Sequence, residues 1–261
     1  MDATFVKPLL MRLATRQDAP RIAEIHMAAF GTNAMLLAQF PTPAIRQALQ
    51  ISIENKALAD IDDPKTTVLV VAVGSDDPEK SLDNVISFAK WSHPVDPSEG
   101  YVEPPWIWPE GTDLETLAAW TARAAEAETR SLGSTPCYRM FPHAEQRIPS
   151  FAPADPFSFN VSLHADRPDD HIGLSFIGTE PSYGSHGAGS LLVQWGIQQS
   201  NTTGSPLYLE STEEAAAFYK KNGLLAGEVI SLPIRLDGNS ETQIYKEIVF
   251  SYHSVPKQTH S

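Results

Sequence analysis

Residues 174–192 join a β-strand pattern to a glycine-rich turn and then to the start of a helix. The apolar strand of residues 172–177 leads into glycines within 184–189, and residues 190–199 have the spacing of a helix. At such a junction the unpaired N–H groups of the first helical turn and the positive end of the helix dipole attract an anion, and glycines let it approach the backbone. The sequence therefore predicts an α/β fold with an anion site, although the same pattern also serves packing alone.

The remaining chain alternates strand and helix patterns, interrupted by a long central section. Between residues 94 and 111 prolines and tryptophans are dense, which predicts an ordered loop without regular structure. Residues 136–170 have weak periodicity and predict an insertion. Strands are expected at residues 10–14, 66–73, 85–93, 172–177, 206–209, 229–232 and 243–252, and helices after Asp18, after Pro43 and at 113–131, 190–199 and 213–222.

Composition limits the class of protein. With 261 residues, of which 42% are hydrophobic, the chain suffices for one substantial core, so a single domain over residues 1–261 is expected. The net charge of -13 opposes binding to nucleic acid or to an anionic membrane. The sequence lacks an apolar stretch typical of export signals or membrane spans, so a cytoplasmic protein is expected. Cys137 is the single cysteine, which excludes an intramolecular disulfide, and His93 and His143 lack a partner at metal-ligand spacing, so no metal site is expected.

The glycine-rich junction resembles the acetyl-CoA-binding motif of the GCN5-related N-acetyltransferase (GNAT) superfamily. Pro181 and Tyr183 fit the family's Pro-x-Tyr element, and Gly187 and Gly189 fit its glycine loop. Near the N-terminus, Arg12–Asp18 with Ile22, Ile25 and Phe30 is similar to the family's opening strand and helix. Leu207–Ser211 resembles the strand after the glycine loop, and Ala217–Gly223 resembles the helix that follows it.

The resemblance implies a GNAT fold, with a mixed and mostly antiparallel sheet flanked by helices and with strands splayed at an acyl-CoA cleft. It places the CoA-binding core at about residues 171–225 and an insertion at about residues 94–170. The enlarged central section is similar to that of fungal GNAT-domain proteins. In such a fold the phosphates are expected to meet the loop residues Gly184, Ser185, His186, Gly187, Ala188, Gly189 and Ser190.

The loop departs from the family pattern at two positions. Gly184 stands where the family usually has Arg or Gln, and His186 stands where it usually has Arg. Contacts to phosphate are therefore expected from the backbone amides of residues 185–190, which do not depend on side chains. A third change, Leu224 in place of an aromatic residue after Gly223, concerns core packing.

Transfer of an acyl group to an amine needs an oxyanion donor and an acid for the departing thiolate. By resemblance Tyr219 is the acid, and the alternative is a packed aromatic side chain. The thioester carbonyl is expected near the N–H of Ile177, and the pantetheine is expected to pair with Ile177, Gly178 and Thr179 like an added strand.

The reaction also needs a base that takes the ammonium proton. Glu210 is the first candidate because it lies near the end of a strand, where burial could raise its pKa. Glu180, His171 and His164 are alternatives.

The resemblance implies an N-acyltransferase that uses acetyl-CoA, or another acyl-CoA, and a small-molecule amine that attacks the thioester directly. An acidic protein suits a cationic amine. Two alternatives remain, a repurposed cleft that binds or transforms another hydrophobic metabolite without acetyl-CoA, and a binding module without turnover. A homodimer is a family-level expectation. Aromatic residues of the central section could line the acceptor pocket, namely Trp106, Trp108, Tyr138, Phe141, Phe151 and Phe157.

Overall fold

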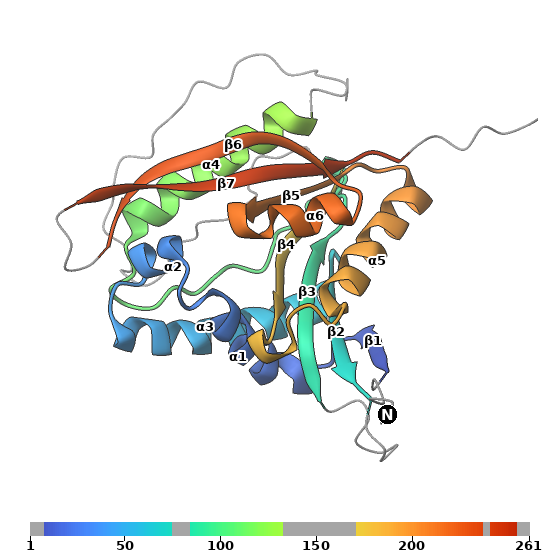
Figure 1. Ribbon diagram of the computed structural model, residues 1–261, viewed down its shortest axis with the longest axis horizontal. Coiled ribbons are helices and arrows are strands. Elements are labelled where there is room, and N and C mark those ends of the chain that lie inside the picture. Colours follow the sequence, from blue (N-terminus) through green and yellow to red (C-terminus); the bar gives the residue numbers. More distant parts are fainter. Residues whose placement is uncertain (1–7, 75–83, 133–170, 237–240, 255–261) are drawn as a thin grey trace, which may run out of the picture.

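The computed structural model describes residues 8–74, 84–132, 171–236 and 241–254, and these contain one seven-stranded sheet (Figure 1). The strand order is β1-β2-β3-β4-β5-β7-β6, and every neighbouring pair is antiparallel except β4 and β5. The expected mixed, mostly antiparallel sheet is confirmed. The strands are β1 (Leu9–Leu13), β2 (Thr66–Val73), β3 (Val85–Ser92), β4 (Ile172–Thr179), β5 (Leu207–Thr212), β6 (Leu225–Arg235) and β7 (Thr242–Tyr252).

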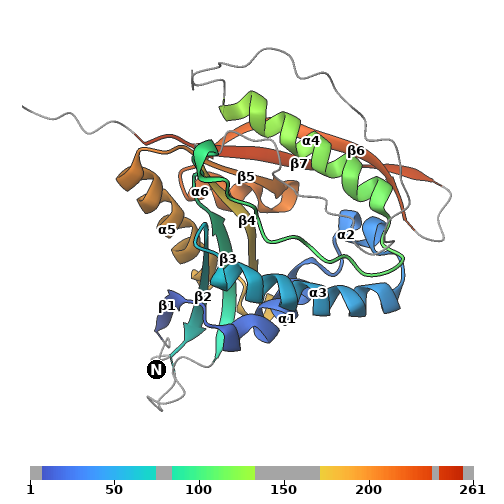
Figure 2. The same cartoon turned by 180° about the vertical axis from the view of Figure 1, so that it is seen from behind.

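Helices cover both faces of the sheet (Figures 1 and 2). Polar caps fix two of the helix starts, since Asn33 Oδ1 accepts the Met35 N–H at 2.8 Å and Thr42 Oγ1 accepts the Ile45 N–H at 3.3 Å. The α-helices are α1 (Ala19–Phe30), α2 (Ala34–Gln39), α3 (Pro43–Asp62), α4 (Leu114–Leu132), α5 (Ala188–Thr203) and α6 (Ala216–Lys221), and the 3₁₀ turns are η1 (Arg16–Asp18), η2 (Pro97–Glu99), η3 (Pro181–Tyr183) and η4 (Glu213–Ala215).

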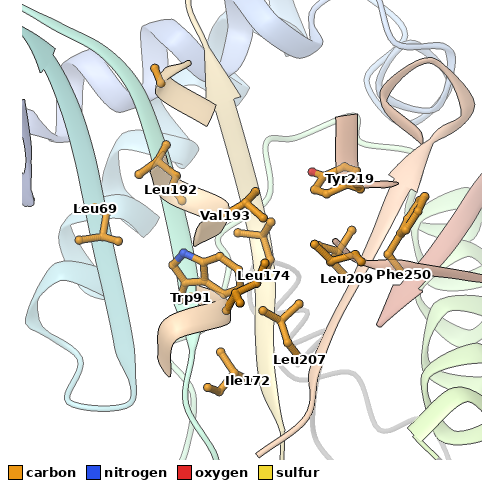
Figure 3. Close-up of a cluster of buried hydrophobic side chains, with 14 of the residues drawn as sticks. Leu69, Trp91, Ile172, Leu174, Leu192, Val193, Leu207, Leu209, Tyr219 and Phe250 are labelled. Atoms are coloured by element: carbon orange, nitrogen blue, oxygen red, sulfur yellow. The ribbon is translucent and has the colours of Figure 1, made fainter. Parts of the chain in front are cut away.

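One face of the sheet packs on α5 and α6, and this core is drawn in Figure 3. Alternate residues of the strands face it, as Leu207 and Leu209 of β5 show. Trp91 is fully buried there against Gly196 of α5, where an added Cβ would lie 2.3 Å from the Trp91 ring. The glycine in the middle of α5 is therefore a packing requirement, because it lets the helix lie on the indole.

The opposite face is covered by α1 and α3 over the first strands, and by α2 and α4 over the last ones (Figure 2). Here the other set of strand residues is buried, including Val70 of β2, Tyr208 of β5 and Val249 of β7. The alanine-rich stretch predicted as a helix is α4, and its Ala124 and Ala127 pack on β5, β6 and β7.

The parallel pair β4 and β5 diverges soon after it begins. Register partners are present only for Ile172 with Leu207 and for Gly173 with Tyr208, and beyond them the strands separate (Figure 1). A β-bulge accompanies the divergence, because Trp91 pairs with Leu174 while Lys90 pairs with Phe176, which leaves Ser175 as the extra residue. The predicted splay between strands is thus present at the end of β4.

Most predicted elements are present, with shifted ends. The loop expected at 94–111 has no α-helix or β-strand and contains the turn η2, as predicted. The short helix α2 was not expected, and β6 extends over Leu225–Arg235 where 229–232 was predicted. The proposed insertion segment 136–170 lies outside the described residues, so the division into insertion and core stays a prediction.

Candidate functional site

The glycine loop forms an open helix N-terminus, as predicted. Gly187 is the N-cap of α5 with φ of 92°, and an added Cβ there would meet nothing within 4 Å. Ser185 also has positive φ, at 64°, and residues 184–187 are mostly exposed. The backbone amides at the start of α5 therefore face open space, which is the geometry that lets a phosphate group approach.

The two unusual loop residues form a local contact with each other. Nδ1 of His186 lies 2.8 Å from the Gly184 carbonyl oxygen and donates to it. His186 is exposed and its ring lies edge-on to Tyr183 at 6.2 Å. The imidazole therefore supports the turn, and the backbone amides at the start of α5 offer contacts to an anion.

Along the edge of β4 the backbone N–H and C=O groups point alternately toward β3 and toward the opening beside β5. The Glu180 N–H donates to the Ile86 oxygen at 2.8 Å, and hydrogen-bonded pairs recur at every second residue of an antiparallel ladder. Gly178 therefore turns its N–H and C=O toward β3, where its carbonyl also accepts the Ser87 hydroxyl at 2.7 Å. Ile177 and Thr179 turn theirs toward the opening beside β5, so the register favours these two, rather than Gly178, as partners of a pantetheine chain.

Glycines at this edge also have packing roles. An added Cβ at Gly178 would lie 2.8 Å from the Phe88 ring, and one at Gly189 would lie 3.2 Å from the Phe218 ring. The second contact brings α5 close to α6. Gly178 thus permits the close approach of the Phe88 ring, and Gly189 leaves room for the Phe218 ring.

A pocket of about 370 Å³ opens on the face of the sheet away from α5. Its walls come from β3, β4, β5 and β7, from α1, α2, α3, α4 and α6, and from the Pro/Trp-rich loop. Three glutamates and no lysine or arginine line it within the described part of the chain. The lining therefore favours a positively charged or neutral ligand over an anion. The ionisable and aromatic residues of the lining include Glu128, Glu210, Glu247, His26, His171, Tyr219, Tyr245, Phe30, Phe40, Phe176, Trp106 and Trp108.

Tyr219 of α6 lies at the opening between β4 and β5. Its side chain is 5% exposed and packs on Phe218 and Phe250, with ring centroids 5.0 and 5.3 Å apart. Figure 3 shows its hydroxyl oxygen turned toward β4. Burial, followed by the nearby charge of Glu247, raises the pKa of this phenol, which keeps it protonated. Tyr219 can therefore both pack in the core and present a proton donor to the pocket.

Two carboxylates lie on the pocket side of β5 and β7. Glu210 of β5 pairs in register with Val249, and Glu247 of β7 pairs with Thr212, so both side chains point to the same face. Glu247 is half-buried, and Tyr245 donates its hydroxyl to Oε1 of Glu247 at 2.5 Å. Burial raises the pKa of Glu247 to about 7, with a smaller contribution in the same direction from Glu210 and an opposing one from the Tyr245 hydrogen bond. Glu247 therefore exchanges a proton near neutral pH.

The alternative bases named from sequence are in different surroundings. Glu180 lies outside the pocket lining and is bonded to Arg21 at 3.0 Å. His171 lines the pocket, and its Nε2 lies 2.7 Å from Oε1 of Glu128 of α4. His164 lies outside the described residues. Of the sequence candidates, the structure therefore brings Glu210, His171 and Tyr219 to one pocket.

An aromatic wall closes the pocket on the side of the Pro/Trp-rich loop. Trp106 and Trp108 are stacked with centroids 4.7 Å apart and an interplanar angle of 3°. Phe176 of β4 lies edge-on to Trp106 at 6.0 Å, and Phe40 lies 5.9 Å from Trp108. Trp106 and Trp108 line this pocket, and their contact with an acceptor stays a prediction. Tyr138, Phe141, Phe151 and Phe157 lie outside the described residues.

A buried charge network lies behind this wall. Lys56 and Asp60 of α3 and Lys90 of β3 form ion pairs of 2.5 and 2.8 Å, and Lys56 also contacts Glu103 at 3.2 Å. The ammonium groups of Lys56 and Lys90 lie 5.9 and 5.7 Å from the Trp106 ring. The network holds α3, β3 and the loop together, and it balances two positive charges with two negative ones.

No protein-family model matches the sequence, and no curated protein matches it. Among solved structures, a histone acetyltransferase HPA2-related acetyltransferase of Corynebacterium glutamicum is similar over 95% of this chain and 98% of that chain, at 18% identity and a TM-score of 0.50. The chain has the GNAT fold.

Two further solved structures show the same kind of likeness. The NAA60 protein of Arabidopsis thaliana, solved with a bisubstrate analogue, covers 95% of this chain and 98% of its own at 12% identity and a TM-score of 0.49. A GCN5-related N-acetyltransferase of Rhodopseudomonas palustris covers 97% and 99% at 13% identity and a TM-score of 0.44. At these identities the likeness to GNAT proteins concerns the fold alone.

Sequence reasoning missed Glu247 and Tyr245 in the GNAT fold. Strand alternation was the available signal, because Glu247 and Val249 share a face of β7 with Tyr245. The strand pattern does not show which face opens into a pocket. That information comes from the divergence of β4 and β5.

The described residues contain no helix long and apolar enough to cross a membrane. They also contain no group of three or more His, Cys, Asp or Glu side chains arranged to hold a metal ion.

Proposed function

We propose that the protein is an acyl-CoA-dependent N-acyltransferase that uses acetyl-CoA and acts on a small-molecule amine. The observation that carries the proposal is the opening between β4 and β5. The exposed N-terminus of α5 and the backbone of Ile177 lie on one side of this opening. The pocket that contains Tyr219 and Glu247 lies on the other side. This arrangement supports a phosphate site at the start of α5 and a proton-transfer site at the pocket.

The loop fits the diphosphate of CoA through its backbone. Gly187 leaves the approach open, and the amides at the start of α5 supply donors and the positive helix end. When bound, acetyl-CoA would supply an acyl thioester beside β4. The N–H of Ile177, turned toward the opening, supports an assignment as the donor to the thioester oxygen.

Glu247 is proposed as the base, a revision of the choice of Glu210 made from sequence. Its pKa of about 7 lets the carboxylate accept the proton of an ammonium group and release it to solvent near neutral pH. Glu210 then acts as a second negative charge that attracts the amine. Tyr219, whose raised pKa keeps the phenol protonated, is proposed to donate a proton to the departing sulfur.

The size and lining of the pocket support a small amine. A volume of about 370 Å³ lies at the small end of the range for small-molecule sites. The glutamates and the absence of lysine and arginine from the described lining suit a cation. A cytoplasmic location and a homodimer stay predictions from the sequence.

Calorimetric titration with acetyl-CoA and free CoA tests the proposal. Binding in the micromolar range, on the order of -8 kcal/mol, is expected for both. A screen of amines that follows release of free thiol from acetyl-CoA then measures turnover. Absence of CoA binding by the folded protein would instead support a repurposed cleft, and CoA binding without acetyl transfer to any amine would support a binding module.

A further inference from the structure

The pocket has chemically different ends. At one end, Glu210, Glu247 and the hydroxyl groups of Tyr219 and Tyr245 come from β5, β7 and α6. This end adjoins the opening where the thioester is proposed to lie, so the reacting amine must be here. The carboxylates bind the ammonium form, and Glu247 can then accept its proton.

The other end is aromatic. Phe30, Phe40, Trp106, Trp108 and Phe176 line it, and their rings form a connected cluster with centroids 4.7 to 6.4 Å apart. Such rings offer faces and edges for stacking with another planar ring.

The five aromatic side chains of this end carry no charge, and the third glutamate of the lining, Glu128, is held by His171, whose Nε2 lies 2.7 Å from Glu128 Oε1. His26, which lies 4.8 Å from Phe30 and 4.9 Å from Phe176, stays uncharged because burial, and then the charge of Lys90, lowers its pKa to about 3. The charges behind Trp106 are matched, since Lys56 and Lys90 face Asp60 and Glu103. A second ligand cation would therefore lose its hydration at this end without gaining a counter-charge.

We infer that the acceptor is a monocationic arylalkylamine, bound with its ammonium group at Glu210 and Glu247 and its aromatic ring among Trp106, Trp108 and Phe176. A short alkyl chain separates the two parts, because the cation and the ring have separate places in one cavity of about 370 Å³. The assignment of the reacting end rests on the proposed function, whereas the binding preference rests on the pocket itself.

The binding preference can be measured on the wild-type protein with matched compounds. 2-Phenylethylamine, 2-cyclohexylethylamine, 2-phenylethanol and 1,6-diaminohexane are titrated calorimetrically, each with and without saturating free CoA. The aromatic amine is expected to bind about tenfold tighter than its saturated counterpart, because the ring gains stacking that the cyclohexyl group lacks. The alcohol lacks the cation and the diamine adds a second one, so both are expected to bind more weakly than the aromatic amine.

Variants assign the two ends. Trp108→Leu is expected to remove the preference for the aromatic ring over the cyclohexyl ring. Glu247→Gln is expected to weaken binding of 2-phenylethylamine and to leave the affinity for 2-phenylethanol unchanged. Trp195→Leu is the matched control, because Trp195 is half-buried on α5, beside Trp91 on the other face of the sheet.

The outcomes separate this inference from the proposed function. Acetyl transfer that favours the saturated amine or the diamine overturns the inference and leaves the transferase intact. Selective binding of the aromatic amine by a protein that fails to bind CoA overturns the transferase and supports the pocket assignment. Equal affinity for all four compounds in wild-type protein overturns the inference, whether or not the variants fold.

Discussion

Replacement of Glu247 by Gln should stabilise the protein at alkaline pH. The pKa of this carboxyl is raised from 4.5 to about 7 by burial, so the folded protein favours the neutral form. The contribution of the neutral Glu247 carboxyl to the free energy of unfolding is fully present below pH 4.5 and is lost as the pH rises through 7. The glutamine of the variant would stay neutral at every pH and could still accept the Tyr245 hydroxyl, so the variant lacks this loss.

The expected change in the free energy of unfolding follows from the ordinary and the raised pKa of Glu247. Each pKa unit corresponds to about 1.4 kcal/mol, so a rise from 4.5 to about 7 changes the free energy of unfolding by at most about 3 to 4 kcal/mol. Glu247 is half-buried, and solvent that reaches the pocket reduces the figure to about 2 kcal/mol. Nearly all of it should develop between pH 4.5 and 7.

Urea denaturation of wild-type protein and Glu247→Gln at pH 5 and pH 8 measures the effect. The two free energies of unfolding should differ little at pH 5, and the variant should be more stable by about 2 kcal/mol at pH 8. Glu213→Gln removes an exposed carboxylate as control and should show no such pH-dependent gain. A Glu247→Gln variant that is no more stable than wild type at pH 8 would refute the raised pKa, and with it the choice of Glu247 as base.

Three further changes test the site and its support. Tyr219→Phe should lower kcat by about 100-fold and leave the Kd of CoA unchanged, because the ring stays while the proton donor is lost; a parallel loss of affinity would contradict the acid role. Gly187→Val should abolish CoA binding in calorimetry, whereas Gly204→Val, at the other end of α5 with φ of 79°, should spare it; equal effects would place the phosphates elsewhere. Asp60→Asn should reduce the free energy of unfolding in urea by about 3 to 5 kcal/mol, since it leaves two buried ammonium groups without their shared partner; exposed Asp62→Asn should change it little, and similar values for the two variants would contradict the network.

The sequence predicts the parts of this fold whose signals are local. The strand, turn and helix around Gly187 form a pattern of adjacent residues, and so do the β-branched run of β2 and the alanine-rich α4. The short helix α2 has six residues and depends on contacts of Met35 and Ala38 with β6, which lie far along the chain. Local patterns do not report such contacts.

The candidate site was predictable where it depends on the motif and not where it depends on topology. Tyr219 and Ile177 follow from the resemblance, and the structure places both at one opening. Glu247 lies in the last strand, and β7 enters the sheet between β5 and β6. Its proximity to Glu210 depends on that non-sequential order, for which the sequence carries no local signal.

The bulge at Ser175 lets β4 contribute side chains to both proposed sites. Leu174 and Ile177 face α5 although they are three positions apart, and Phe176 between them faces the aromatic pocket. If Ser175 were paired in register instead of bulged, strict alternation would turn Phe176 toward α5 and Ile177 toward the amine pocket. The proposed cofactor and acceptor sites thus both use β4, because the extra residue Ser175 shifts the alternation of side chains along this strand. Deletion of Ser175 would be expected to remove the bulge and to leave the faces of residues 176–179 unchanged.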